Sequence, residues 1–173
     1  PELISARKPG LIQHFNYFFG AVEIEPVMLI QLHPLLNGWR KILKQGNCLM
    51  EEKFENEKLE VADNFIKYKN IRAEKIFFCN GTNSFLHPYW KNLPYIFNKG
   101  EALIVDIPGL QANNIYKFGN STLVPWYNNL WWQGSSYENE YENIFPSKLF
   151  MEKKKQELNM FLKLPFTIID HYA

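Results

Sequence analysis

The chain has 173 residues, which is enough for one domain with a sizeable hydrophobic core. Its 19 Lys and Arg residues against 18 Asp and Glu residues leave a formal net charge of +1. A near-neutral chain offers no basic field to a phosphate backbone, so we expect no nucleic-acid partner. Aromatic residues make up 16% of the chain, and we interpret them as core and sheet packing because each ring buries a large area.

The cysteines, Cys48 and Cys79, are too few for a disulfide framework, and they fit a reducing cytoplasm. No stretch approaches the roughly 18 apolar residues of a membrane span, so we expect no membrane partner. The 4 histidines lack the spacing of a zinc site, and we therefore predict no metal.

The first predicted element is an amphipathic helix that begins near Pro34 and ends at Gly46, with apolar residues at helical spacing. Three short segments rich in aromatic and β-branched residues follow, and we predict strands at Cys48 to Phe54, Phe65 to Tyr68 and Ile76 to Cys79. Pro88 interrupts the next segment and Pro94 ends it, so Asn83 to Leu93 is predicted as a short helix or a loop.

From Glu101 onward the pattern is rich in strands, which we predict at Ala102 to Ile107, Thr122 to Val124, Leu130 to Gln133 and Phe166 to Ile169. Asn128 and Asn129 indicate a hairpin turn between the second and third of them. Ser147 to Lys163 is predicted as a helix in which Lys153 pairs with Glu157.

This order predicts one domain over residues 1–173 with an α+β fold. Its largely antiparallel, mixed β-sheet should carry the helices around Leu35 and Leu158 on one face.

No complete catalytic constellation is present, and no catalytic residue is assigned. The 9 glycines never fall in the G-x-G-x-x-G spacing that lets a backbone approach a pyrophosphate. The sequence also lacks a P-loop and a G-x-S-x-G nucleophile turn.

Four segments resemble, in order and spacing, the flavoprotein family of D-amino-acid oxidase and glycine oxidase. Lys75 to Gly81 resembles the family's "I-I-x-C/A-x-G" strand and turn, and Asn98 to Leu103 resembles its K-G-E-x-L segment. Ser121 to Pro125 and Trp132 to Tyr137 resemble the two strands of its "x-V-P" and "V-G-A-T-x" hairpin. Phe19 to Ile24 also fits the family, so the resemblance covers nearly the whole chain.

The resemblance implies that the chain is the substrate-binding portion of a larger FAD-dependent oxidoreductase. Such an enzyme transfers a hydride from the carbon that bears an amine to the flavin, with an amine or amino acid as its small-molecule substrate. The family's nucleotide-binding N-terminal unit and its C-terminal G-x-R-P segment are absent from this sequence. We therefore expect the fragment not to bind FAD tightly, to be inactive alone and to self-associate through uncovered apolar surface.

Residue by residue, the resemblance implies a substrate pocket at Thr122 and Tyr137, with Tyr137 opposite Thr122 across the hairpin. It implies that Phe54 lies near the adenine and that Cys79, Asn80 and Gly81 lie near the flavin diphosphate. Without the resemblance, these residues are ordinary strand and turn positions.

Two other hypotheses remain open. One is a non-catalytic binding module that uses an aromatic platform of Trp126, Tyr127, Trp131 and Trp132. Strand alternation weakens it, because adjacent Trp131 and Trp132 should face opposite sides. The other is an assembly module that acts through a β-sheet edge.

Overall fold

The computed structural model describes residues 9–16 and 20–173. Phe19, which is part of one family match, and residues 1–8 lie outside the described residues. The chain divides into two compact units, Pro1–Glu25 with Pro94–Ala173 and Pro26–Leu93, which we describe one at a time. The expectation of a single domain over residues 1–173 stays a prediction.

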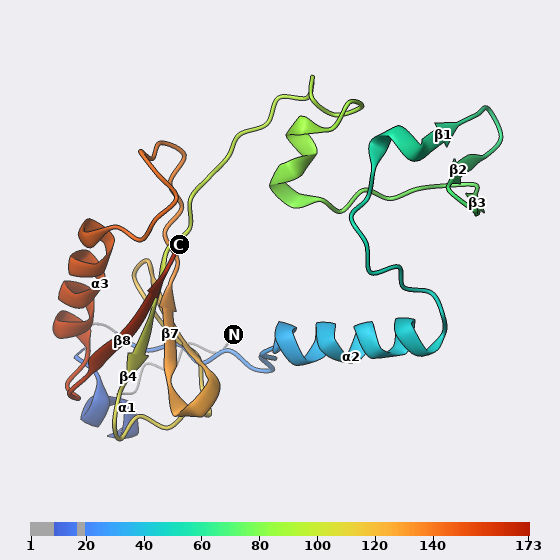
Figure 1. Ribbon diagram of the computed structural model, residues 1–173. Coiled ribbons are helices and arrows are strands. Elements are labelled where there is room, and N and C mark those ends of the chain that lie inside the picture. The colour runs from blue at the N-terminus through green and yellow to red at the C-terminus, as the bar shows by residue number, and fades with distance from the viewer. Residues whose placement is uncertain (1–8, 17–19) are drawn as a thin grey trace. The chain divides into compact units, whose positions relative to one another are not determined.

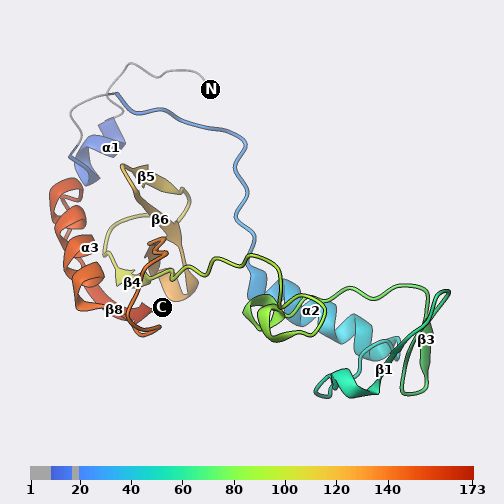
Figure 2. The same ribbon diagram turned by 90° about the horizontal axis from the view of Figure 1, so that it is seen from above.

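The first unit is built around a five-stranded sheet with the order β5-β6-β7-β4-β8 (Figures 1 and 2). The strands are β4 (Ala102–Asp106), β5 (Tyr116–Phe118), β6 (Ser121–Pro125), β7 (Trp131–Gly134) and β8 (Thr167–Tyr172). Every pairing between these strands is antiparallel. The predicted α+β fold is therefore confirmed, and four of the predicted strands lie in this sheet.

Helix α3 (Lys148–Phe161) packs on one face of this sheet. Its Phe150 and Leu158 are buried against apolar side chains of the strands. Short helix α1 (Pro9–His14) lies at the end of α3 beside β5 (Figure 2), where Phe15 pairs with Leu162 and contacts the Tyr116 ring. The core consists of these apolar side chains: Phe15, Leu103, Val105, Ile107, Leu110, Leu123, Trp131, Phe150, Leu158 and Leu162.

The hairpin from β6 to β7 turns through the 3-10 segment η3 (Tyr127–Asn129). Asn128 and Asn129 have φ angles of 57° and 59°, a left-handed conformation that asparagine tolerates better than most residues. The predicted hairpin turn is thus confirmed. The asparagine pair indicates it because asparagine tolerates the left-handed conformation that the turn requires.

The second unit contains a small antiparallel sheet of β1 (Leu59–Val61), β2 (Ile66–Tyr68) and β3 (Ile71–Ala73). Helix α2 (Leu32–Gln45) is the predicted amphipathic helix, and Gly46 is its C-cap, which agrees with the predicted stop. The other elements are the 3-10 segments η1 (Asn56–Lys58) and η2 (Gly81–Leu86). Because α2 belongs to this unit and none of its residues is buried, its predicted packing on the large sheet stays a prediction.

Two strand predictions in this unit are wrong. Cys48 to Phe54 and Ile76 to Cys79 form no strand, and the structure leaves them as irregular backbone. In the first segment Glu51 and Glu52 make ion pairs with lysine and arginine side chains. In the second, Phe78 packs into an aromatic cluster whereas Phe77 is 83% exposed. Ion pairs of the glutamates and ring packing of Phe78 hold these segments without a neighbouring strand.

Candidate functional site

The sheet face opposite α3 holds the predicted pocket residue Thr122. Cross-strand pairing aligns Ala102, Gly134 and Thr122 in one row across β4, β7 and β6. The next residues along the strands face α3, because side chains alternate between the two faces. Thr122 therefore lies on the face away from the core, and it is half-buried there.

The indole of Trp132 covers the centre of this second face. A Cβ atom added at Gly134 would lie 2.9 Å from Cζ2 of Trp132 and 2.9 Å from Cβ of Ala102. The ring thus occupies the space above Gly134, between the strands that carry Ala102 and Thr122. Trp132 is the aromatic residue beside Thr122, and the family resemblance did not identify it.

The predicted place of Tyr137 is wrong. The partner of Thr122 across the hairpin is Gly134, and β7 ends at that residue. Tyr137 lies beyond the strand with 74% of its surface exposed, next to Glu138, which pairs with Lys99. The prediction extended the hairpin past its last paired residue. After Gly134 the backbone pairs instead with the segment that precedes β4.

Glu101, which precedes β4, is the centre of a buried polar cluster that the sequence did not reveal. Its Oε1 accepts from Ser147 Oγ at 2.7 Å and lies 3.0 Å from Lys99 Nζ, and its Oε2 accepts from the Ser147 N–H at 2.6 Å. His171 Nε2 lies 2.8 Å from Oε2 without hydrogen-bond geometry. Burial raises the pKa of Glu101, but the hydrogen bonds from Ser147 and Lys99 outweigh it and hold that pKa below its ordinary value.

A second buried cluster joins α3 to β6 and β7. Lys154 Nζ donates to Ser121 Oγ at 3.0 Å and to Glu157 at 2.7 Å, and the Ser121 hydroxyl donates to Glu157 at 2.6 Å. The prediction that Lys153 pairs with Glu157 is wrong. Lys154 makes the ion pair with Glu157 instead, because it faces the sheet. Ser121 and Lys154 resemble a nucleophile and its base, yet they are only 1% and 4% exposed. Without access for a substrate they hold the helix to the sheet.

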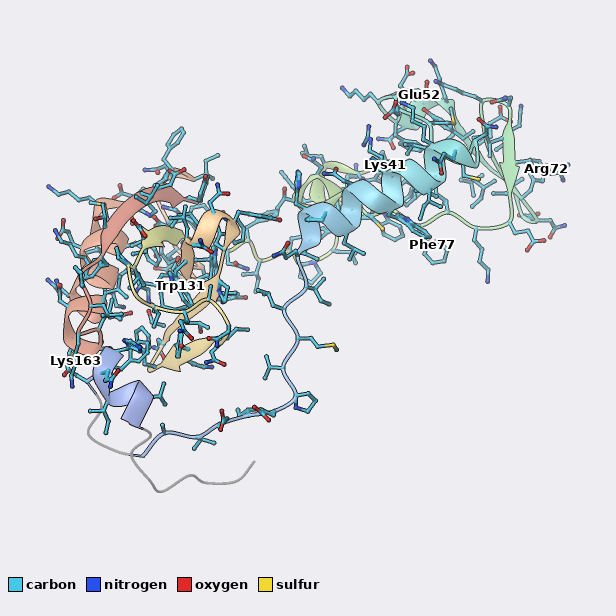
Figure 3. All side chains as sticks on the ribbon, turned by 90° about the horizontal axis from the view of Figure 1, so that it is seen from below. Lys41, Glu52, Arg72, Phe77, Trp131 and Lys163 are labelled. Atoms are coloured by element: carbon cyan, nitrogen blue, oxygen red, sulfur yellow. The ribbon has the colours of Figure 1, made fainter. Side chains whose placement is uncertain are left out.

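The fully buried Trp131 lies between this sheet and α3 (Figure 3). Its neighbour Trp132 is on the opposite face. Trp126 and Tyr127 lie in the turn, 43% and 38% exposed, with ring centroids 5.1 Å apart. The four rings therefore do not share one surface, as strand alternation predicts.

The positions that the resemblance assigns to the cofactor all lie in the second unit. Phe54 stacks on Tyr68 at 4.6 Å and meets the edge of Phe78 at 5.8 Å, which brings it near the turn that starts at Cys79. The Cys79 thiol is free and exposed. Asn80 precedes η2 without a side-chain cap, and Gly81 has a φ of 56° with open space where a Cβ would lie.

His87 is a further residue that the sequence did not identify. It is 4% exposed, its Nδ1 accepts from the Tyr89 N–H at 3.3 Å, and its Nε2 is buried without a partner among the described residues. The rings of Phe78, Tyr89 and Trp90 surround it.

Among the described residues, no group of His, Cys, Asp and Glu side chains could hold a metal ion, and no helix could cross a membrane. No protein-family model matches the chain, and no solved structure matches it.

Proposed function

We propose that this chain is the substrate-domain part of a flavin-dependent oxidoreductase that oxidises an amine or an amino acid. The observation that carries the proposal is the antiparallel sheet with one face on α3 and the other formed by Ala102, Ile104, Thr122 and Trp132. Such a face can serve as the floor of a pocket whose opposite wall is a flavin ring.

In this proposal bound FAD supplies the acceptor for the hydride. The chain orients the substrate, because a rigid sheet fixes the position of the reacting carbon. Thr122 offers a hydroxyl, and the Trp132 indole offers an apolar surface beside it. Tyr137 stays a proposed pocket residue on the resemblance alone, since it does not lie across from Thr122.

For the cofactor, we propose that Phe54 lies near the adenine and that the turn of Cys79, Asn80 and Gly81 lies near the diphosphate. Open space at Gly81 fits this role, because a diphosphate needs a close approach to the backbone. The glycine fingerprint is missing from this sequence, so we propose that the chain alone neither holds FAD tightly nor turns over. The free thiols of Cys48 and Cys79 support a cytoplasmic location.

The test uses protein made from the complete coding sequence that contains this chain. We expect a flavin absorption spectrum, and we expect anaerobic bleaching of the flavin by a panel of amines and amino acids. Thr122→Leu should raise KM by about tenfold, equivalent to about 1.4 kcal/mol, with an unchanged spectrum. Leu149→Ser, on the exposed side of α3, is the control and should leave KM unaltered. A colourless protein with no flavin would reject the proposal.

A further inference from the structure

The two edges of the large sheet differ in how they are protected. β5 is an edge strand of 3 residues with exposed Lys117 at its centre, and a short strand with an outward lysine is a poor template for pairing. β8, the other edge, has 6 residues and contains no Lys, Arg or Pro. Unpaired N–H and C=O groups on such an edge accept an added strand readily. β8 therefore needs a protecting feature of another kind.

One such feature is a bulge at Ile169. Ile104 pairs with Asp170 and Val105 pairs with Ile168, so Ile169 is an extra residue without an opposite partner on β4. A bulge bends an edge strand and interrupts the regular ladder. Ile169 is nevertheless 53% exposed, and Tyr172 is 54% exposed. The bulge alone leaves apolar side chains along the edge.

The second feature is Asp170. Its Oδ1 accepts from the backbone N–H of the next residue, His171, at 2.8 Å. Hydrogen bonds from the Tyr172 hydroxyl and from the His171 N–H also lower the pKa of Asp170. The carboxylate is thus fixed along the strand, and a backbone donor of β8 is occupied from within the strand.

We propose that Asp170 is a guard residue that keeps β8 from pairing with β8 of a second copy of this chain. A second copy is the fitting partner because two-fold antiparallel pairing of identical strands would bring the two Asp170 carboxylates close together, and like charges across strands are destabilising. The capped His171 N–H adds a lost hydrogen bond to the cost of pairing. The latent surface is the outer edge of β8.

Two substitutions separate the hydrogen-bond cap from the charge. Asp170→Ala removes both, and it should raise the association constant of the whole chain at least tenfold over the unsubstituted chain in sedimentation velocity. Asp170→Asn removes the charge but keeps an oxygen that can accept the His171 N–H, so its association should lie between that of the unsubstituted chain and that of Asp170→Ala. Equal association of both variants would show that charge alone guards the edge, and no change in either would reject the proposal.

A second pair of variants locates the new contact. Ile169→Lys added to Asp170→Ala should return association to its original level, because an outward lysine blocks strand addition. Leu149→Lys, an equivalent change on the exposed side of α3, should not do so. Hydrogen exchange in 167–172 should slow in associated Asp170→Ala. Association without slower exchange in β8 would place the contact elsewhere and overturn the proposal.

Discussion

Single side chains decide how the large sheet is held together, and Glu101 is the clearest case. Its carboxylate accepts hydrogen bonds from Ser147, pairs with Lys99 and lies close to His171. One buried charge therefore links the start of β4 to α3 and β8. Breaking a buried ion pair costs more than making it stabilises, because it leaves the other charge unpaired. The stability of the sheet should therefore depend on the ionisation of this one group.

We expect Glu101→Gln to lower the free energy of unfolding at about pH 7 by about 3–5 kcal/mol, since Lys99 would stay buried without its partner. The folded-state pKa of Glu101 is lowered, so its contribution is present above the unfolded pKa and is lost as pH falls through the folded pKa. Urea unfolding across the acid range should show a shallower acid loss in the variant. The double variant Lys99→Met, Glu101→Leu should recover part of the loss. Parallel acid loss in wild type and Glu101→Gln would contradict this assignment.

At Gly134 the lack of space for a side chain is what requires a glycine. Gly134→Ala should cost about 1–3 kcal/mol, because the new methyl group would push against Trp132 and against Ala102 of the neighbouring strand. Displacement of the half-buried indole should also shift tryptophan emission to longer wavelength. Gly100→Ala is the matched control, since its nearest contact would be an ordinary 3.6 Å. Equal stability of the two variants in urea would exclude the close approach of the Trp132 ring.

Helix α3 begins at an N-cap, Ser147, that has two roles. Ser147 Oγ accepts from the Phe150 N–H and donates to Glu101. Ser147→Ala should therefore cost about 1 kcal/mol or more. Aspartate is ordinarily a good N-cap, yet here it would place a second carboxylate beside Glu101, so Ser147→Asp should be less stable than Ser147→Ala at neutral pH. Thermal unfolding at neutral and acid pH would check this order. If Ser147→Asp were more stable than Ser147→Ala at neutral pH, the Glu101 carboxylate would not repel a charge at the N-cap.

Sequence patterns predicted most strands and the helix of the large sheet. They failed for segments whose structure depends on individual side-chain contacts. The strands at Ala102 and Thr122 followed from a local pattern rich in strand-forming residues, and the helix at Leu158 followed from its Lys and Glu content with apolar residues on one side. The strand at Cys48 was wrong, since local pattern cannot show that no neighbouring strand is present. The clusters of Glu101 and Lys154 depend on contacts between distant segments, and no spacing in the sequence reports them.

The exposed apolar side chains of α2 need a partner. Leu35 and Trp39 are each 57% exposed and Ile42 is 58% exposed, on a helix of 14 residues with no buried residue. An isolated helix of this length is marginal in water, so most of its stability must come from packing of the apolar face. Exposed apolar surface of this extent favours association.

We therefore expect the chain to self-associate as its concentration rises, with α2 at the contact. Ile42→Lys should weaken association at least tenfold in sedimentation velocity, because a charge on the apolar face must be desolvated to pack. Lys41→Gln, which changes a residue of the polar face, is the control and should associate like the unsubstituted chain. Trp39 should become more protected from acrylamide quenching as the chain associates, because the contact covers its ring. If Ile42→Lys and Lys41→Gln sediment alike while association persists, the contact lies elsewhere and α2 gains its stability from another partner.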